Sequence, residues 1–153
     1  MKKFNTTAVC IPSRHYMVDL SGRVAEIKSL IDEGAYFTIN RARQYGKTTT
    51  ITALKKAISN EYEVISLDFQ GISEGGFVTE QVFVQEFAQL ILKKRKSIHC
   101  IPESVENKLS RYVSQEEPTI RLSELFITLN EWCDVSSKPV VLIIDEVDSA
   151  TNM

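Results

Sequence analysis

Near its C-terminal end the chain carries a continuous run of apolar residues, Val140 to Ile144, followed directly by Asp145 and Glu146. The run does not alternate apolar with polar side chains, so the strand that it predicts is apolar on both faces. Such strands are typical of parallel sheets that helices cover on both sides. An α/β fold is therefore expected from this segment before any other is considered.

The rest of the chain alternates predicted strands with predicted helices. Strands are expected at residues 35–40, 62–69 and 139–145, and helices at 21–33, 47–59, 79–96 and after Pro102 and Pro118. This alternation predicts βαβ units and a mainly parallel sheet. We expect one domain over residues 1–153, with a lead-in and first helix at 1–34 and the core at 35–153.

Composition excludes several classes of protein. The 153 residues are 43% hydrophobic and 25% charged, which is the range of soluble globular proteins. No apolar run is long enough to cross a bilayer, and the start lacks the apolar region of a secretion signal, so we expect a cytoplasmic protein without a membrane partner. The net charge of −2 gives no general attraction to nucleic acid, and the basic run Lys93–Lys96 is interpreted as a solvated helix end, with nucleic-acid contact as the alternative.

A candidate phosphate-binding loop runs from Asn40 to Thr49, after a predicted strand and into a predicted helix. The first turn of a helix offers unpaired N–H groups and the positive end of the helix dipole, and both attract phosphate. Gly46 lets the backbone approach closely, Lys47 is placed to reach the β- and γ-phosphates, and Thr48 can give its hydroxyl to Mg²⁺. The predicted nucleotide-binding residues are Arg43, Gln44, Tyr45, Gly46, Lys47, Thr48 and Thr49.

The loop departs from the usual pattern at one position. Arg41 stands where a glycine is usual, five residues before Gly46. Arg41 and Arg43 are interpreted as compensating phosphate contacts, with a solvent or partner contact as the alternative. A plain basic helix start on a solvated surface is the other interpretation, although a lysine is disfavoured at a helix N-terminus by the dipole.

The acidic pair Asp145-Glu146 comes where the predicted strand leaves the sheet at its carboxyl edge, which is where ligands of open α/β sheets bind. There Asp145 can hold Mg²⁺, and Glu146 can orient and deprotonate a water for attack on the γ-phosphate. The alternative is a strand that ends in solvated acids. Asp68 ends strand 62–69 at the same edge; it is interpreted as capping a turn, with approach to the attacking water as the alternative.

At these residues the chain resembles the P-loop NTPases with an additional catalytic glutamate, and more closely the AAA-like, archaeal-type and STAND-related bacterial ATPases. The resemblance implies a three-layer α/β/α fold with ATP and Mg²⁺ as ligands. It implies that Lys47 and Glu146 are catalytic and that Thr48 and Asp145 hold the metal. It also implies a sensor strand and lid arginines beyond Met153, so the sheet is expected to be incomplete at the C-terminus.

Three functions are compatible with these residues. The first is Mg²⁺-dependent ATP hydrolysis coupled to a conformational change in the full-length protein. The second is a nucleotide-gated switch of the STAND type with slow hydrolysis, and the third is a truncated pseudo-ATPase that binds nucleotide without turnover. A protein partner or self-association is compatible with each, and the choice of ATP over GTP comes from the resemblance alone.

Overall fold

The computed structural model describes residues 19–40, 46–96, 98, 101–114 and 119–147. Within these residues it contains five α-helices and a two-stranded parallel sheet, so the expected α/β class is confirmed. The chain divides into two compact units, Met1–Asn60 and Glu61–Met153, which we call the N-terminal and C-terminal units and describe in turn.

The N-terminal unit contains two helices that contact each other, α1 (Ser21–Asp32) and α2 (Lys47–Ile58). At the start of α1, the Ser21 N–H donates to the Asp19 carboxylate at 2.9 Å, which lowers the pKa of Asp19. After α1 comes Gly34 with a φ of 68°, a conformation that glycine adopts without strain. Both helices therefore begin and end close to their predicted limits.

The strand predicted at residues 35–40 is absent from the structure. These residues follow α1 without regular secondary structure, and Tyr36 is fully exposed. A strand is stable only when a neighbouring strand satisfies its N–H and C=O groups, and no described segment pairs with residues 35–40. The strand prediction rested on local propensity, and propensity without a pairing partner does not make a strand.

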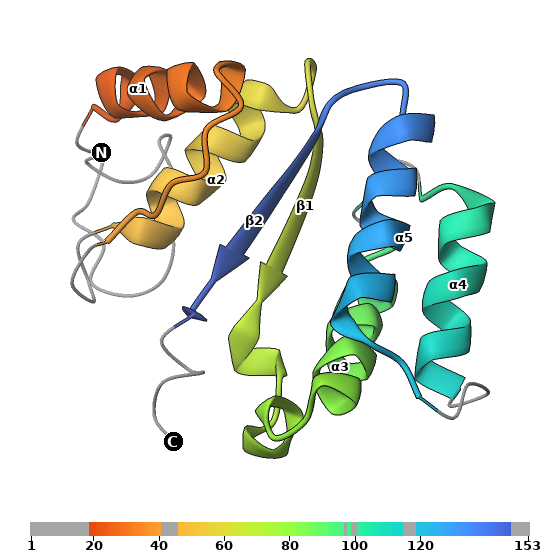
Figure 1. Cartoon of the computed structure of the whole chain (residues 1–153). Coiled ribbons are helices and arrows are strands. Elements are labelled where there is room, and N and C mark those ends of the chain that lie inside the picture. The colour runs from red at the N-terminus through yellow and green to blue at the C-terminus, as the bar shows by residue number, and fades with distance from the viewer. Residues whose placement is uncertain (1–18, 41–45, 97, 99–100, 115–118, 148–153) are drawn as a thin grey trace. The chain divides into compact units, whose positions relative to one another are not determined.

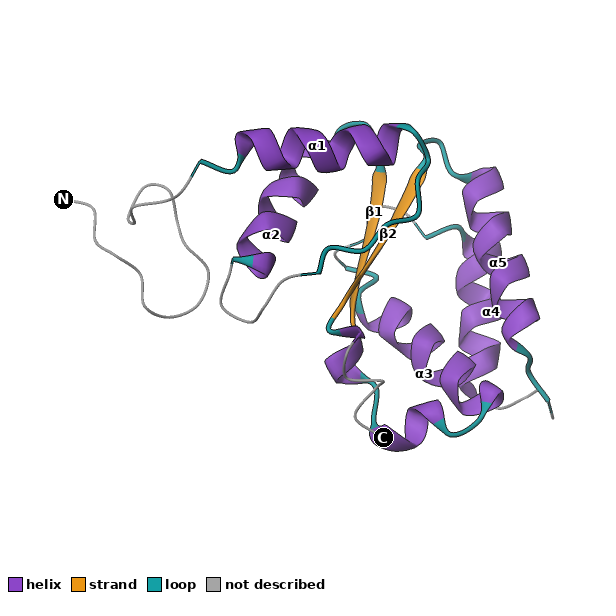
Figure 2. Ribbon diagram, turned by 60° about the vertical axis from the view of Figure 1, so that its left-hand side comes forward, coloured by secondary structure: helices purple, strands orange, loops and turns teal. Residues whose placement is uncertain are grey.

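The C-terminal unit contains strands β1 (Glu63–Asp68) and β2 (Val140–Asp145), which pair in parallel. The register places Glu63 opposite Val140 and Asp68 opposite Asp145. Three helices connect the strands and lie together on one side of the sheet (Figures 1 and 2). They are α3 (Glu80–Lys93), α4 (Glu103–Ser114) and α5 (Leu122–Val135), and the short 3₁₀ turns Phe69–Gly71 and Glu74–Phe77 precede them.

The core of this unit lies between β1 and the helices. Ile65 and Leu67 on β1 are buried together with Ile91 on α3, Leu109 on α4 and Trp132 on α5. Each such side chain contributes roughly 1.5–3 kcal/mol when it is fully buried. The helices that connect the strands are therefore held by apolar contacts to the strand that precedes them in the chain.

Strand β2 is less buried than its sequence predicts. Its residues are half-buried rather than buried on both faces, and the Leu142 side chain is 39% exposed. Among the described residues of the C-terminal unit, only β1 pairs with β2, and the helices cover one side of the sheet. The expectation of burial on both faces is therefore wrong for this structure, because burial depends on neighbours that the strand's own sequence does not supply.

Candidate functional site

The predicted phosphate loop ends at a glycine whose backbone is left-handed. Gly46 has φ 76° and ψ 23° and caps α2, which begins at Lys47. The Gly46 carbonyl accepts hydrogen bonds from the backbone N–H and the hydroxyl of Thr50, each at 2.9 Å. A side chain at this φ would be strained, so the turn into α2 requires glycine for conformational reasons alone.

The first turn of α2 carries the predicted phosphate and metal residues. Lys47 and Thr49 are half-buried there and Thr48 is exposed, and the turn contains no acidic residue. The N–H groups at a helix start have no partner within the helix, so this end of α2 has the composition of an anion site. The remaining predicted residues, Arg43, Gln44 and Tyr45, lie outside the described residues, as does Arg41.

The carboxyl edge of the sheet gathers acidic side chains. Asp68 and Asp145 are partners in the β1–β2 register, so both side chains leave the same face of neighbouring strands, which lie about 4.8 Å apart. The Asp68 carboxylate accepts the Gln70 N–H at 2.9 Å, which confirms the interpretation of Asp68 as a turn cap. Because Asp68 and Asp145 are partners in the register, this turn cap lies beside the predicted metal ligand Asp145.

Glu146 directly follows Asp145 and has an unusual backbone. Its φ is 55°, and it is the non-glycine residue with positive φ among the described residues. Its N–H donates to the Asp145 carboxylate at 2.9 Å. Non-glycine residues in this region cost roughly 1–3 kcal/mol and persist where their surroundings enforce the conformation. No pattern in the sequence predicted it, because glutamate has no preference for left-handed backbone.

The carboxylates at this edge fit Mg²⁺ in part. Magnesium prefers oxygen ligands and usually takes only one or two protein carboxylates, with waters and substrate phosphates completing its shell. Asp145 and Asp68 supply such oxygens at one edge, whereas no group of three metal-ligating side chains was found in the part of the chain that the structure describes. These residues therefore suit a cation brought with a phosphate ligand rather than a cation held by the protein alone.

Comparison with family models gives a match to the AAA-like domain over residues 4–152. The chain belongs to the AAA-like domain family. Membership associates this AAA-like domain with nucleotide-binding ATPases in general, and with ATP and Mg²⁺ at the level of the family. No curated protein and no solved structure matched the chain. In the described residues of the AAA-like domain, none of the helices has the length and apolar character needed to span a bilayer.

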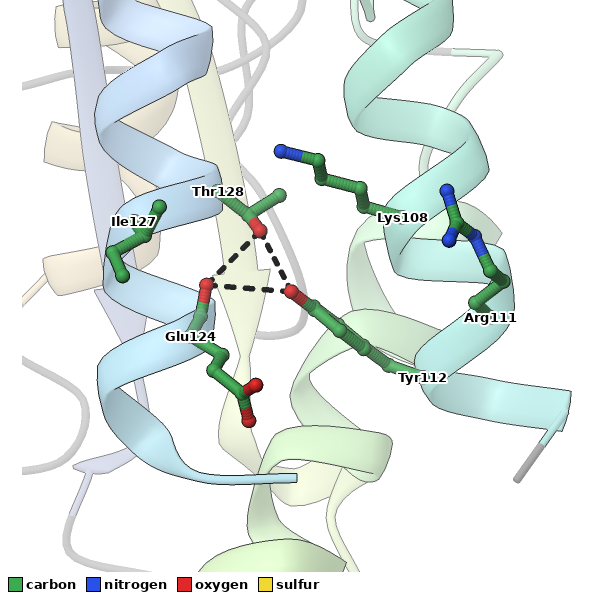
Figure 3. Close-up of a pocket in the computed structure, with 6 residues that line it drawn as sticks. All are labelled: Lys108, Arg111, Tyr112, Glu124, Ile127 and Thr128. Atoms are coloured by element: carbon green, nitrogen blue, oxygen red, sulfur yellow. Dashed lines mark hydrogen bonds between the residues drawn. The ribbon is translucent and has the colours of Figure 1, made fainter. Parts of the chain in front are cut away.

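A cleft between α4 and α5 was not anticipated from the sequence. It has a volume of about 250 Å³ and contains none of the predicted nucleotide or metal residues (Figure 3). Its lining residues are Lys108, Arg111, Tyr112, Glu124, Ile127 and Thr128. The only sequence signal was the presence of polar residues beside the apolar stripes of the helices at residues 103–114 and 122–135.

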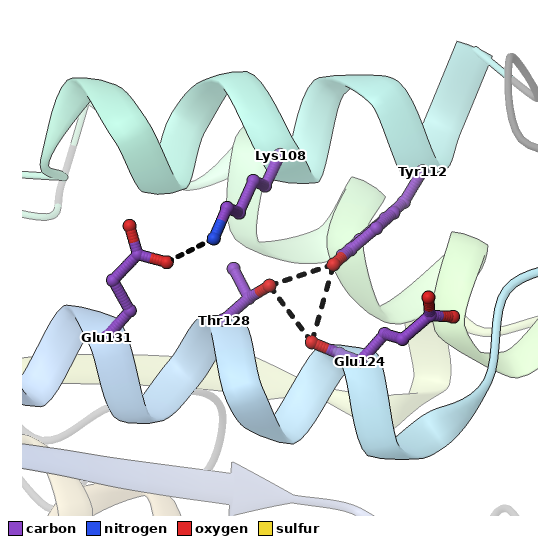
Figure 4. A network of polar contacts seen from close by, with 5 residues as sticks. All are labelled: Lys108, Tyr112, Glu124, Thr128 and Glu131. Carbon is purple, nitrogen blue, oxygen red and sulfur yellow. Dashed lines mark hydrogen bonds and ion pairs between the residues drawn. The ribbon is translucent and has the colours of Figure 1, made fainter.

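A cluster of polar contacts across this cleft joins the two helices (Figure 4). The Tyr112 and Thr128 hydroxyls are 2.8 Å apart, and both reach the Glu124 carbonyl, at 3.3 and 3.0 Å. Further along, Lys108 forms an ion pair with Glu131, and this contact lowers the pKa of Glu131, with a smaller contribution from the Ser104 hydroxyl. The hydroxyl hydrogens are used within the protein, so we interpret the cluster as fixing α4 against α5.

Proposed function

We propose that this AAA-like domain binds Mg²⁺-ATP and, within the intact protein, hydrolyses it to drive a conformational change. The observation that carries the proposal is the left-handed Gly46 at the start of α2, directly before Lys47 and Thr48, in a chain of the AAA-like family. Support also comes from the position of Asp145 and Glu146 at the carboxyl edge of a parallel pair of strands, since this edge is where α/β sheets bind ligands.

In this proposal each predicted residue has one role. Lys47 neutralises charge on the β- and γ-phosphates, while residues 43–49 surround the phosphates with backbone N–H groups. Thr48 and Asp145 hold Mg²⁺, which when bound offsets the negative charge that develops on the phosphate oxygens. Glu146 orients a water and takes its proton. A three-layer P-loop sheet with further strands beside β2 is part of the same proposal.

A second candidate, the nucleotide-gated switch with slow hydrolysis, is favoured by one observation. Glu146 has a left-handed backbone that costs free energy at the carboxyl edge of the sheet. In the proposed switch, Glu146 reaches its working orientation only after this backbone rearranges, and that step limits the rate of hydrolysis. Single-turnover and steady-state rates of the intact protein separate the candidates, because a switch completes one slow turnover and an ATPase cycles.

Two variants test the assignments in the intact protein. Lys47→Ala removes a charged phosphate contact and is expected to weaken Mg²⁺-ATP binding by roughly ten- to a hundredfold, as measured by thermal shift or calorimetry. Lys55→Ala, two turns further along α2, is the matched control and should bind normally. Glu146→Gln should keep binding and abolish hydrolysis. Hydrolysis by Glu146→Gln at the normal rate, or normal binding by Lys47→Ala, would contradict the proposal.

A further inference from the structure

Thr50 is a polar residue in the buried stripe of α2. It shares this stripe with Leu54 and Ile58, which follow one and two turns further along the helix, and it is only 1% exposed. A buried hydroxyl needs a hydrogen-bond partner, and the Thr50 hydroxyl donates to the Gly46 carbonyl at 2.9 Å. The Thr50 side chain is therefore fixed both by burial and by a bond to the residue that precedes α2.

The Gly46 carbonyl belongs to a peptide group whose other end is the Lys47 N–H. The carbonyl and the N–H of a trans peptide lie in one plane and point in opposite directions. Because the Gly46 carbonyl points along α2 to the N–H and the hydroxyl of Thr50, the Lys47 N–H points out of the helix start. In the proposed function this N–H is one of those that surround the phosphates. Thr50 thus orients a group of the proposed site without belonging to the residues that bind the ligand.

The Gly46–Lys47 peptide needs such a restraint more than a peptide inside the helix does. Gly46 is left-handed with ψ 23°, and it lacks the side chain that narrows the backbone torsions of other residues. The peptide can therefore tilt at small cost unless its carbonyl is held. A carbonyl that accepts hydrogen bonds also polarises its own amide group, so the N–H at the other end becomes a better donor. Both effects favour a phosphate oxygen in front of the Lys47 N–H.

We propose that Thr50 is a positioning residue of the nucleotide site. Its hydroxyl fixes and polarises the Gly46–Lys47 peptide, so that the Lys47 N–H already has its binding orientation before the phosphate arrives. A donor that is oriented in advance costs less ordering when the ligand binds. The inference rests on the proposed function and adds to it a residue that lies outside the predicted loop 43–49 and acts through Gly46.

Thr52 provides a matched control within the same helix. Threonines in helices commonly donate to the carbonyl four residues back, and the Thr52 hydroxyl donates to the Thr48 carbonyl at 2.7 Å on the exposed side of α2. The peptide that follows Thr48 lies between two helical residues, so the helix itself fixes its orientation. Thr50→Val and Thr52→Val therefore remove the same kind of hydrogen bond, and only Thr50→Val should change the nucleotide site.

Calorimetric binding of Mg²⁺ with the non-hydrolysable analogue β,γ-methylene ATP tests the role. Thr50→Val keeps the size and branching of the side chain and should weaken binding about three- to tenfold, the factor for one neutral hydrogen bond. Thr50→Ser restores the hydroxyl and should bind like the wild type, as should Thr52→Val. If the valine variant does not fold, Thr50→Ala compared with Thr50→Ser measures the same effect. Equal affinity with and without the hydroxyl would overturn the inference.

NMR observes the peptide directly, because Gly46-Lys47 is the only Gly-Lys pair in the sequence. Protein labelled with ¹³C-carbonyl glycine and ¹⁵N-lysine gives one HNCO resonance for this pair. Without ligand, Thr50→Val should move the Gly46 carbonyl carbon upfield, because the carbonyl loses one hydrogen-bond donor, whereas Thr52→Val should leave it in place. With Mg²⁺ and the analogue, the Lys47 amide proton should move downfield in the wild type and less in Thr50→Val. A carbonyl resonance unmoved by Thr50→Val would also refute the role.

The affinity of the wild type separates the positioning role from the proposed function. Wild type that does not bind Mg²⁺ with the analogue would refute the proposed function, and the role of Thr50 with it. Wild type and Thr50→Val that bind equally well would refute the role of Thr50 alone and leave nucleotide binding intact. Equal losses of affinity in Thr50→Val and Thr52→Val would indicate a general weakening of α2, and would likewise refute a specific role for Thr50.

Discussion

Asp68 at the end of β1 lies directly opposite Asp145 at the end of β2. Like charges on directly opposed strand residues destabilise a sheet. The repulsion between the two carboxylates therefore lowers the stability of the sheet at the edge where the AAA-like domain is proposed to bind Mg²⁺-ATP. A cation bound at this edge would offset that cost, which makes the pair testable by measurements of stability.

Asp68→Asn should raise the free energy of unfolding by about 0.5 kcal/mol in metal-free, low-salt buffer, because it removes the repulsion with Asp145. The amide oxygen can still accept the Gln70 N–H that Asp68 accepts at 2.9 Å. Urea unfolding followed by fluorescence of Trp132, the only tryptophan in the sequence, measures the change. Asp68→Ala removes the cap as well and should be the less stable variant; a destabilised Asp68→Asn would argue against repulsion.

Gly46→Ala should destabilise the start of α2 by about 1–2 kcal/mol, because an alanine at φ 76° is strained. Apart from its chain neighbours, no described residue has an atom within 4 Å of the position that a Cβ would take at Gly46, so the cost is conformational and not steric crowding. Gly22→Ala is the control: it also meets open space, but lies in α1 without a positive φ, and should be neutral or stabilising. Helix content and Tm by circular dichroism measure both variants.

Tyr112→Phe and Thr128→Val should each destabilise the C-terminal unit by about 1 kcal/mol, because each removes a hydroxyl from a buried hydrogen bond of 2.8 Å. The double variant should cost less than the sum of the two, since both single changes break the same contact. Unfolding followed by Trp132 fluorescence on α5 gives the three free energies. Strict additivity would contradict a shared hydrogen bond between these side chains.

The ion pair between Lys108 and Glu131 predicts a pH dependence. The contact lowers the pKa of Glu131 from its ordinary value of 4.5, so the folded chain holds this proton less tightly than the unfolded chain. Its contribution to stability is then present above about pH 4.5 and lost as the pH falls through the lowered pKa. The Tm advantage of the wild type over Glu131→Gln should therefore shrink as the pH falls from 7 to 3.

Salt provides a second check on this ion pair. Both side chains are partly exposed, so added NaCl should screen their attraction and reduce the same Tm difference at pH 7. Lys108→Gln should reproduce the effect of Glu131→Gln at neutral pH. A Tm difference that is independent of both pH and salt would mean that the charges of the pair do not contribute to stability.

Sequence reasoning succeeded where local patterns carry the information. The helical spacing of apolar residues predicted α2 and α3. Thr79, the first residue of the predicted helix, caps α3, with its hydroxyl accepting the Val82 N–H at 3.2 Å. The β-branched runs predicted β1 and β2 to within one or two residues. The roles of Lys47 and Glu146 in phosphate chemistry stay predictions, which the variants above address.

Sequence reasoning failed where an outcome depends on distant neighbours. Residues 35–40 have the composition of a strand, yet no described segment pairs with them. The polar cluster of Tyr112 and Thr128 requires two helices to be placed side by side, and spacing within one helix does not reveal it. The left-handed backbone of Glu146 at the end of β2 was not predicted either, because glutamate has no preference for that conformation.

The amino-acid sequence by itself determined where the helices and the two paired strands lie, that the class is α/β, and that glycine precedes Lys47 at a helix start. Tertiary structure alone decided the register that sets Asp68 against Asp145, the half-exposure of β2 and the backbone of Glu146. The physical reason is the separation along the chain of the residues that interact. Helix periodicity and capping act over a few consecutive residues, whereas strand pairing, burial and side-chain contacts depend on residues far apart in the chain.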